Sequence, residues 1–254
     1  LLLSSSLTYF TEKILPKNPN KKIFLRSTLL ELGGNSLYAL SSLIGAKQDT
    51  LGTYRALGVP FSQYVRTNVD LRLTHDIDLK NVLVYRLNVG LALPYGNREF
   101  LPVDKRYFVG GANSLRGWNP RAMGPGQYPD NTNSTSLDRT AELLILGNLE
   151  YRFSVIAKRV EMALFFDGGN VWNIVEGDDQ VEKFSFGNFL PSTALNTGIG
   201  LRIDFQFFMI RLDWGIRMHN PALPAGERWI IRDWNKPNFV TNQTLLNFGL
   251  DYPF

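Results

Sequence analysis

The sequence predicts an all-β protein, and within that class a transmembrane antiparallel β-barrel. Three observations predict this fold. Several segments alternate apolar and polar residues with a period of two, and the polar positions of those segments are rich in Arg, Asp, Asn and Gly. Short turns also alternate with long loops between the segments, which is the pattern of an outer-membrane barrel.

The alternating segments have the length of membrane strands, since a tilted strand needs about 9 to 11 residues to cross a bilayer. In chain order they are the ranges 64–73, 81–93, 143–153, 195–205 and 208–216. Leu87 and Val89 lie on the opposite face from Arg86 and Asn88, for example. The range 1–10 is expected to be the end of a further strand.

The polar face distinguishes a barrel from a soluble antiparallel sandwich, which would alternate as well. A sandwich turns its polar face to bulk water, commonly through Lys, Thr and Ser. In this chain the polar face carries Arg, Asp, Asn and Gly, and large Leu, Ile and aromatic residues fill the apolar face. This composition favours an apolar belt against lipid around a hydrated, charge-paired lumen.

Composition excludes several other classes. No run of about eighteen apolar residues exists, and the mean hydropathy of -0.12 is too polar for a helical membrane protein. Without cysteine there is no disulfide scaffold and no thiolate metal site, and we expect neither a metal nor a cofactor. The net charge of +4 is mild, and Lys17, Lys21 and Lys22 are expected in a solvated turn, not at a nucleic-acid surface.

Loop lengths orient the predicted barrel, because outer-membrane barrels keep short turns on the periplasmic side and long loops outside. The short turns are 76–80, 157–159 and the region of Gln206; the long loops are 35–60, 99–140, 170–191 and 219–243. Within the first long loop, the range 36–44 fits either a short amphipathic helix or a strand extension. An aromatic girdle is expected near the periplasmic ends, from Tyr151, Phe153, Phe205, Tyr252 and Phe254.

The loop 99–140 contains the Gly110-Gly111 pair and then Leu115-Arg116-Gly117-Trp118. An arginine held inside a barrel needs a carboxylate, and Asp167, in Phe165-Phe166-Asp167, points into the same interior if the alternation continues. Glu150 lies on the lumen face of the intervening strand and is a second candidate partner. The alternatives are a surface turn around Arg116 and an ordinary Asp-Gly turn at Asp167-Gly168.

The chain ends in Asn247-Phe248-Gly249-Leu250-Asp251-Tyr252-Pro253-Phe254. This order of a polar residue, a glycine, a hydrophobic residue and a final aromatic fits the assembly signal of outer-membrane barrels, and any barrel of that membrane can carry it. The alternative is a frayed strand end. Asn247, Gly249, Tyr252 and Phe254 are therefore expected to belong to the last strand.

Together the loop motif, the Phe-x-Asp motif and the ending are similar to the BamA/TamA superfamily of outer-membrane assembly barrels, also called the bacterial surface antigen family. The resemblance covers most of the chain. Trp118 departs from it, since Phe or Tyr is more usual there. The segments 93–97 and 121–126 resemble the TamA-like lipoprotein branch of Bacteroidetes, the TamL-like proteins, more than BamA itself.

The resemblance implies a barrel of sixteen strands in the bacterial outer membrane, of which the range 1–254 would be the C-terminal part, with eight or nine strands. Upstream POTRA modules and the first strands would precede it. Loop 99–140 would fold into the lumen, where Arg116 pairs with Asp167. The last strand would close weakly, because Gly249 offers no side chain to pack and Pro253 lacks an N–H.

The function implied is assembly or translocation of outer-membrane proteins, in which client strands add to the open seam. The implied partners are outer-membrane lipids, unfolded clients and accessory or periplasm-spanning subunits. The alternatives within reach are a two-partner secretion pore or a passive porin. An outer-membrane enzyme is disfavoured, since the chain has only His75 and His219 as candidate bases and no Gly-x-Ser-x-Gly motif.

Overall fold

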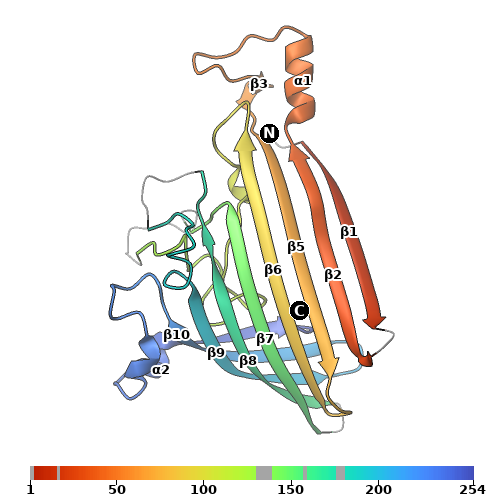
Figure 1. Cartoon of the computed structure of the whole chain (residues 1–254), viewed down its shortest axis with the longest axis vertical. Coiled ribbons are helices and arrows are strands. Elements are labelled where there is room, and N and C mark those ends of the chain that lie inside the picture. The colour runs from red at the N-terminus through yellow and green to blue at the C-terminus, as the bar shows by residue number, and fades with distance from the viewer. Residues whose placement is uncertain (1–2, 16–17, 130–138, 157–158, 176–180) are drawn as a thin grey trace.

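The structure, a computed structural model, describes residues 3–15, 18–129, 139–156, 159–175 and 181–254. Within these ranges it forms one nine-stranded antiparallel sheet in the order β1-β2-β5-β6-β7-β8-β9-β10-β11 (Figure 1). The strands are β1 Ser4–Leu15, β2 Asn18–Gly33, β5 Gln63–Asp76, β6 Asn81–Tyr95, β7 Leu143–Ile156, β8 Val160–Trp172, β9 Ala194–Asp204, β10 Met209–His219 and β11 Thr244–Leu250.

Smaller elements occupy the long loops. They are α1 Asn35–Leu43, the two-stranded sheet of β3 Arg55–Ala56 and β4 Val59–Pro60, the 3-10 turns Val103–Lys105 and Ile230–Asp233, and α2 Phe239–Gln243. Over the residues that the structure describes, no helix is both long enough and apolar enough to cross a membrane.

The five alternating segments all form strands, as predicted, and the range 36–44 takes the helical alternative as α1. The first strand runs further than expected, to Leu15. One prediction is wrong: Lys21 and Lys22 lie in β2, paired with His75 and Thr74 of β5, and not in a turn. β2 lies between β1 and β5 in the sheet, so pairing with both neighbours keeps the strand extended through the two adjacent lysines. Lys17 lies outside the described residues.

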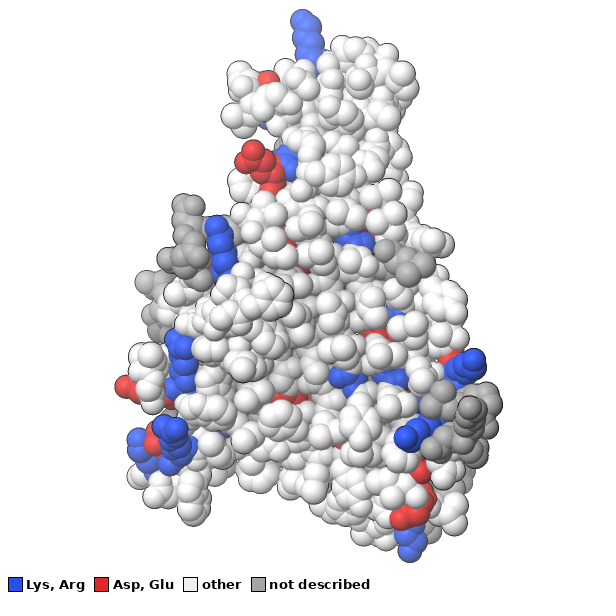
Figure 2. All heavy atoms as spheres, viewed as in Figure 1, with Lys and Arg blue, Asp and Glu red and all other residues white. Residues whose placement is uncertain are grey.

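The sheet curls, so that β9 and β10 turn away from β1, β2 and β5 (Figure 1). Strand residues alternate between its two faces: Leu149 and Leu164 are exposed on the convex face, whereas Glu150 and Asp167 are fully buried on the concave face. Figure 2, in the same view, shows that few acidic or basic atoms are visible over the strands. The apolar belt and the charged lumen therefore form on the predicted faces.

The described part of loop 99–140 packs on the concave face. Its described residues Val109, Leu115, Trp118 and Met123 pack with Leu146 of β7 in one buried apolar cluster. Burial of large side chains of this kind stabilises the folded state by about 1.5 to 3 kcal/mol each. The upper part of the lumen is thus a packed core, and this core holds the loop tip against the wall.

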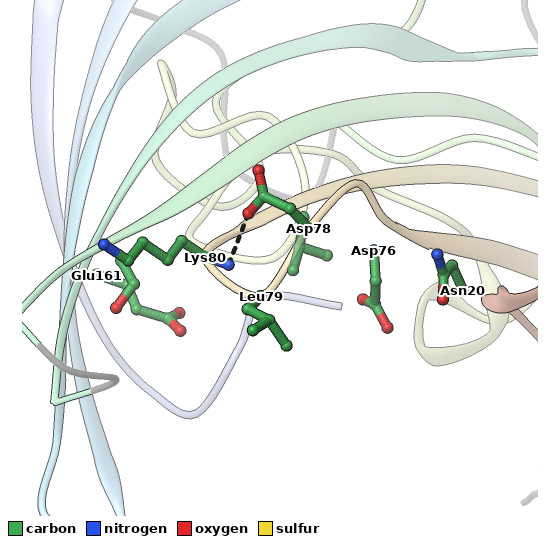
Figure 3. A pocket seen from close by; sticks show the side chains of 8 residues that line it. Asn20, Asp76, Asp78, Leu79, Lys80 and Glu161 are labelled. Atoms are coloured by element: carbon green, nitrogen blue, oxygen red, sulfur yellow. Dashed lines mark hydrogen bonds between the residues drawn. The ribbon is translucent and has the colours of Figure 1, made fainter.

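At the opposite end, the short turn between β5 and β6 borders a cavity of 600 Å³ lined by Asp76, Asp78, Lys80 and Glu161 among others (Figure 3). Asp78 accepts hydrogen bonds from the backbone N–H groups of Lys80 and Asn81, at 2.7 and 2.9 Å. Hydrogen bonds from Asn81 and Lys80 lower the pKa of this carboxyl. Asp78 therefore stabilises the turn that joins the strands.

Candidate functional site in the lumen

A group of buried charged side chains lies on the concave face where β7, β8, β9 and β10 meet the loop tip. This group, called the lumen cluster below, consists of Arg116, Glu150, Arg152, Asp167, Arg202, Arg211 and Asp213. Arg116 comes from the loop and the other six from strands, where alternation turns every second residue inward.

Arg116 and Asp167 form the centre of the lumen cluster. The guanidinium donates from Nε to Asp167 Oδ2 at 2.9 Å and from Nη2 to Oδ1 at 2.8 Å, and the backbone N–H of Arg116 donates to Oδ2 at 3.2 Å. Asn148 and Asn196 each donate to the same carboxylate at 2.8 Å. A bidentate contact of this kind fixes both distance and angle, so the pair specifies where the loop sits.

Two more carboxylates surround Arg116. Its Nη1 lies 2.5 Å from Glu150 Oε2 and 3.6 Å from Asp213 Oδ2, and Arg202 bridges the same two acids at 3.0 and 2.8 Å. The guanidinium carbon also lies 3.5 Å from the centre of the Phe165 ring. The structure therefore brings Arg116 together with Asp167, Glu150 and Phe165, as the sequence suggested.

Glycines on the concave face make room for these contacts. A Cβ on Gly215 would lie 2.3 Å from the carbonyl oxygen of Arg116, and one on Gly198 would lie 2.4 Å from the Phe165 ring. Gly117, in the loop motif, would meet Asn196 at 2.9 Å. Glycine at these positions of the polar face thus has a packing cause, since a larger residue at Gly215 would push against the Arg116 backbone and one at Gly198 against Phe165.

The loop backbone is also tied to the strands around it. Asn148 donates to the Ser114 carbonyl at 2.9 Å, and Arg217 donates to the Gly117 carbonyl at 2.8 Å. From the last strand, Asn247 donates to the Arg116 carbonyl at 2.7 Å. The loop tip consequently contacts β7, β10 and β11 through the backbone carbonyls of Ser114, Gly117 and Arg116.

The remaining motif residues are structural. Leu115 and Trp118 are buried in the apolar cluster, and the guanidinium of Arg217 lies 5.4 Å from the Trp118 ring. The Trp118 side chain is 2% exposed and fills the space beside Arg217. The structure gives Leu115 and Trp118 a packing role beside the charge role of Arg116.

A second anchor of the loop was missed in the sequence. Lys105 forms an ion pair with Glu31 of β2, and Tyr64 donates to the same carboxylate at 2.9 Å. Tyr107 donates to the carbonyl of Thr67 at 2.7 Å, and burial raises the pKa of Tyr107 to about 12. Glu31 lies in β2, a strand that the alternation did not predict, and no local motif marked its partner.

The end of the chain differs from the prediction. β11 ends at Leu250, and Asp251 adopts a left-handed conformation with φ of 61°, which turns the following residues inward. Tyr252 donates to Glu161 at 2.8 Å, and its ring lies 4.1 Å from the Arg152 guanidinium.

The Phe254 ring lies 5.6 Å from the guanidinium carbons of both Arg86 and Arg116. Tyr252 and Phe254 are therefore not part of the last strand or of an outer girdle, which corrects the prediction. Pro253 also lies outside the ladder and cannot weaken it. Asn247 and Gly249 do lie in β11, and a Cβ on Gly249 would lie 2.6 Å from Arg211 Nη2.

Across the described ranges, no group of three or more His, Cys, Asp or Glu side chains is arranged to hold a metal ion. Each acid of the lumen cluster contacts at least one arginine instead. The lumen cluster therefore holds the loop by electrostatic contacts.

A family model described as the Omp85 superfamily domain matches residues 46–231, which is more than half of the chain. The chain belongs to the Omp85 superfamily. As a member it is an outer-membrane β-barrel protein, so the convex apolar face meets lipid and the concave face forms the lumen. The finer assignment to the TamA-like branch stays a prediction.

Among similar proteins, the outer membrane protein assembly factor BamA of Neisseria meningitidis serogroup B is 28% identical over 101 residues, which are 39% of this chain and 13% of that protein. Among solved structures, BamA from Haemophilus ducreyi lacking POTRA domains 1–3 matches 98% of this chain and 53% of its own, at 13% identity and a TM-score of 0.49. CdiB from Acinetobacter baumannii matches 97% and 41%, at 11% identity and a TM-score of 0.39. The chain thus spans about half the length of the first solved relative and less of the others.

Proposed function

We propose that the chain is the barrel portion of an outer-membrane factor that assembles or translocates other outer-membrane proteins, and that it acts without covalent chemistry. The observation that carries the proposal is the fixed position of the loop arginine in a chain of the Omp85 superfamily. A relative of this superfamily is named as the assembly factor BamA, and we extend that activity to this chain.

The proposed working part is the edge at β11. This strand has seven residues and, among the described residues, one strand neighbour, β10. Seven residues are fewer than the roughly 9 to 11 that a membrane strand needs, so the wall is shorter here. We propose that so short a strand pairs weakly with the first strand of the complete barrel, and that an unfolded client adds to its edge by backbone hydrogen bonds.

The loop supports this proposal because its attachment is uneven. The side chain of Arg116 is held by acids on β7, β8 and β10, whereas β11 contacts the motif through one hydrogen bond, from Asn247. β11 can therefore move away while the loop stays on the wall. The loop also occupies the lumen beside this wall, which disfavours a passive open pore.

The partners follow from the same proposal. Clients would be unfolded outer-membrane proteins, the surrounding lipid would be thinned beside the short strand, and accessory or POTRA modules would deliver clients from the periplasm. A complete protein that exports one dedicated secreted partner and assembles no barrel client would be a secretion pore and not an assembly factor.

The test is to lock the edge. The chain has no cysteine, so one cysteine at Phe248 of β11 can be joined to one on the first strand of the complete barrel, reconstituted in lipid vesicles. We expect the oxidised protein to lose assembly of an unfolded barrel client and the reduced protein to regain it. The matched control joins Trp214 to Leu246, register partners in β10 and β11, which leaves the edge free. Client assembly by the locked protein at the control rate would overturn the proposal.

A further inference from the structure

The convex face of β7 and β8 has a groove of 430 Å³ in the apolar belt. Gly147 and Gly168 are register partners and both lie on that face, so the floor of the groove carries no side chain. The apolar side chains around the floor are Tyr85, Leu87, Ile145, Leu149 and Phe166.

Strand register explains the shape of the groove. Four register partners lie in a row across β6, β7, β8 and β9, in the order Leu87, Gly147, Gly168 and Leu195. The two glycines are therefore flanked by one leucine on each side. Two residue pairs further from the long loops, at the next pair on the same face, Leu149 and Phe166 close the groove. The depression is therefore a gap in an otherwise continuous row of large side chains.

The long-loop end of the groove is covered. Phe189 and Thr193, from the loop between β8 and β9, line it there, and the Phe189 ring packs against Trp172 at 5.5 Å. The Thr193 hydroxyl donates to the Phe189 carbonyl at 2.7 Å, so its polar atom is satisfied within the loop. The groove thus has an aromatic roof toward the outside of the membrane.

The groove offers its occupant apolar surface. Arg86 and Asn148 also line it, but Arg86 binds Asp70 on the concave face and Asn148 binds Asp167 there. Both polar side chains are thus engaged in the lumen. A concave apolar site of roughly 300 to 1,000 Å³ is the size range of ligand pockets in proteins, and this groove lies within it.

We propose that this groove binds one acyl chain of a lipid in the outer leaflet of the membrane. The proposal rests on the outer-membrane location of the chain and not on the proposed assembly function. The medium at this face is hydrocarbon, and the groove lies in the half of the wall nearer the long loops, which face outward in such barrels. An acyl chain in the groove touches the backbone of β7 and β8 on the convex face, opposite the Asn148 and Asp167 side chains on the concave face.

Gly147 provides a clean way to fill the groove. A Cβ there would have its nearest neighbours at 3.8 and 4.0 Å, which is ordinary contact, so a side chain can point outward without moving the wall. At Gly168 a Cβ would lie 2.8 Å from Leu195, so that position is unsuitable. Gly147→Leu is therefore the variant of choice, and Gly147→Ala is a milder second one.

The experiment uses the complete protein in vesicles of phosphatidylethanolamine and phosphatidylglycerol, with a trace of phosphatidylethanolamine that carries a diazirine on its acyl chain. After irradiation, mass spectrometry measures the adducts on each residue. We expect Tyr85, Phe166 and Phe189 to be labelled several-fold more than Leu164, an exposed residue of the same belt outside the groove.

Gly147→Leu is expected to lower groove labelling about tenfold, the loss that corresponds to roughly two methylene groups no longer buried. Gly147→Ala is expected to lower it partially, and it remains informative if the larger variant fails to fold. Val69→Leu, on the same face of β5 outside the groove, is the control and is expected to change nothing. Even labelling across the belt, groove labelling that survives Gly147→Leu, or adducts replaced by cross-links to another protein would each overturn the proposal.

Discussion

The β7–β8 pair and the β10–β11 pair differ in how firmly they are held, although both are antiparallel and both alternate. The register joins thirteen residue pairs in β7–β8 and seven in β10–β11. The first pair also carries Asp167 and Glu150, which hold the loop arginine, whereas among the described residues β11 donates one side-chain hydrogen bond to the loop motif, from Asn247. The wall that holds the loop is thus distinct from the edge at which we propose that the barrel opens.

Magnitudes show why this difference matters. Removing one partner of a buried ion pair costs about 3 to 5 kcal/mol, whereas a single hydrogen bond contributes about 0.5 to 1.5 kcal/mol. Separating the loop from β7 and β8 therefore costs several times more than separating it from β11. Strand opening is expected at β11 while the lumen cluster stays intact.

The largest effect is expected from Asp167→Ala. This change leaves the Arg116 guanidinium without its bidentate partner in a site where both side chains are fully buried, at a cost of about 3 to 5 kcal/mol. We expect a lower unfolding midpoint in urea and loss of client assembly, with the barrel still inserted, as judged by its heat-dependent migration on gels. Wild-type stability and assembly in this variant would show that the Arg116–Asp167 ion pair supports neither.

A charge swap refines the same test. With Asp at 116 and Arg at 167, the new carboxylate would face Glu150 and Asp213, which already lie 2.5 and 3.6 Å from the present guanidinium. We expect the swap to fail to restore assembly, because like charges would then meet in a buried site. Restoration to the wild-type level would mean that Arg116 and Asp167 act as an isolated pair.

The next effect concerns the two faces of the wall. Gly198→Ala places a Cβ 2.1 Å from the Trp214 carbonyl oxygen and against Phe165, and such overpacking costs about 1 to 3 kcal/mol. Gly147→Ala on the convex face meets nothing closer than 3.8 Å and is expected to change stability by less than about 0.5 kcal/mol. Equal unfolding midpoints for the two variants would contradict this contrast.

Asn247→Ala is expected to have a smaller effect, confined to the edge. It removes the donor to the Arg116 carbonyl, a loss of about 0.5 to 1.5 kcal/mol. Amide hydrogen exchange should become faster in β11 and stay unchanged in β7 and β8. Faster exchange throughout the wall would show that the two regions are coupled.

Tyr252→Phe is expected to have the smallest effect. It removes the hydrogen bond to Glu161 at a half-exposed site and leaves the ring beside Arg152, so the loss is about 0.5 kcal/mol. Exchange of the amides near Leu250 is the measurement, and Tyr151→Phe, which removes a comparable bond to Asn81, is its control. If Tyr252→Phe increased amide exchange more than Asn247→Ala does, the Tyr252 hydrogen bond would be the stronger of the two contacts.

Much of the site was predictable because its signals are local. The motif at 115–118 and the inward position of Asp167 suggested the ion pair, and alternation added Glu150. The predicted lumen face also included Arg202, Arg211 and Asp213, but no sequence motif distinguished them from other inward-facing charged residues. The inward turn after Leu250 was missed because it depends on one residue, Asp251, in a left-handed conformation.

The sequence by itself determined the two faces of the wall, because alternation with a period of two follows from strand geometry alone. It also determined which end has long loops. Only the tertiary structure decided which inward charges meet the loop, that Lys105 reaches Glu31, and that two glycines on neighbouring strands leave a groove in the belt. The physical reason is that these contacts depend on register and curvature, which bring together residues tens of positions apart in the chain.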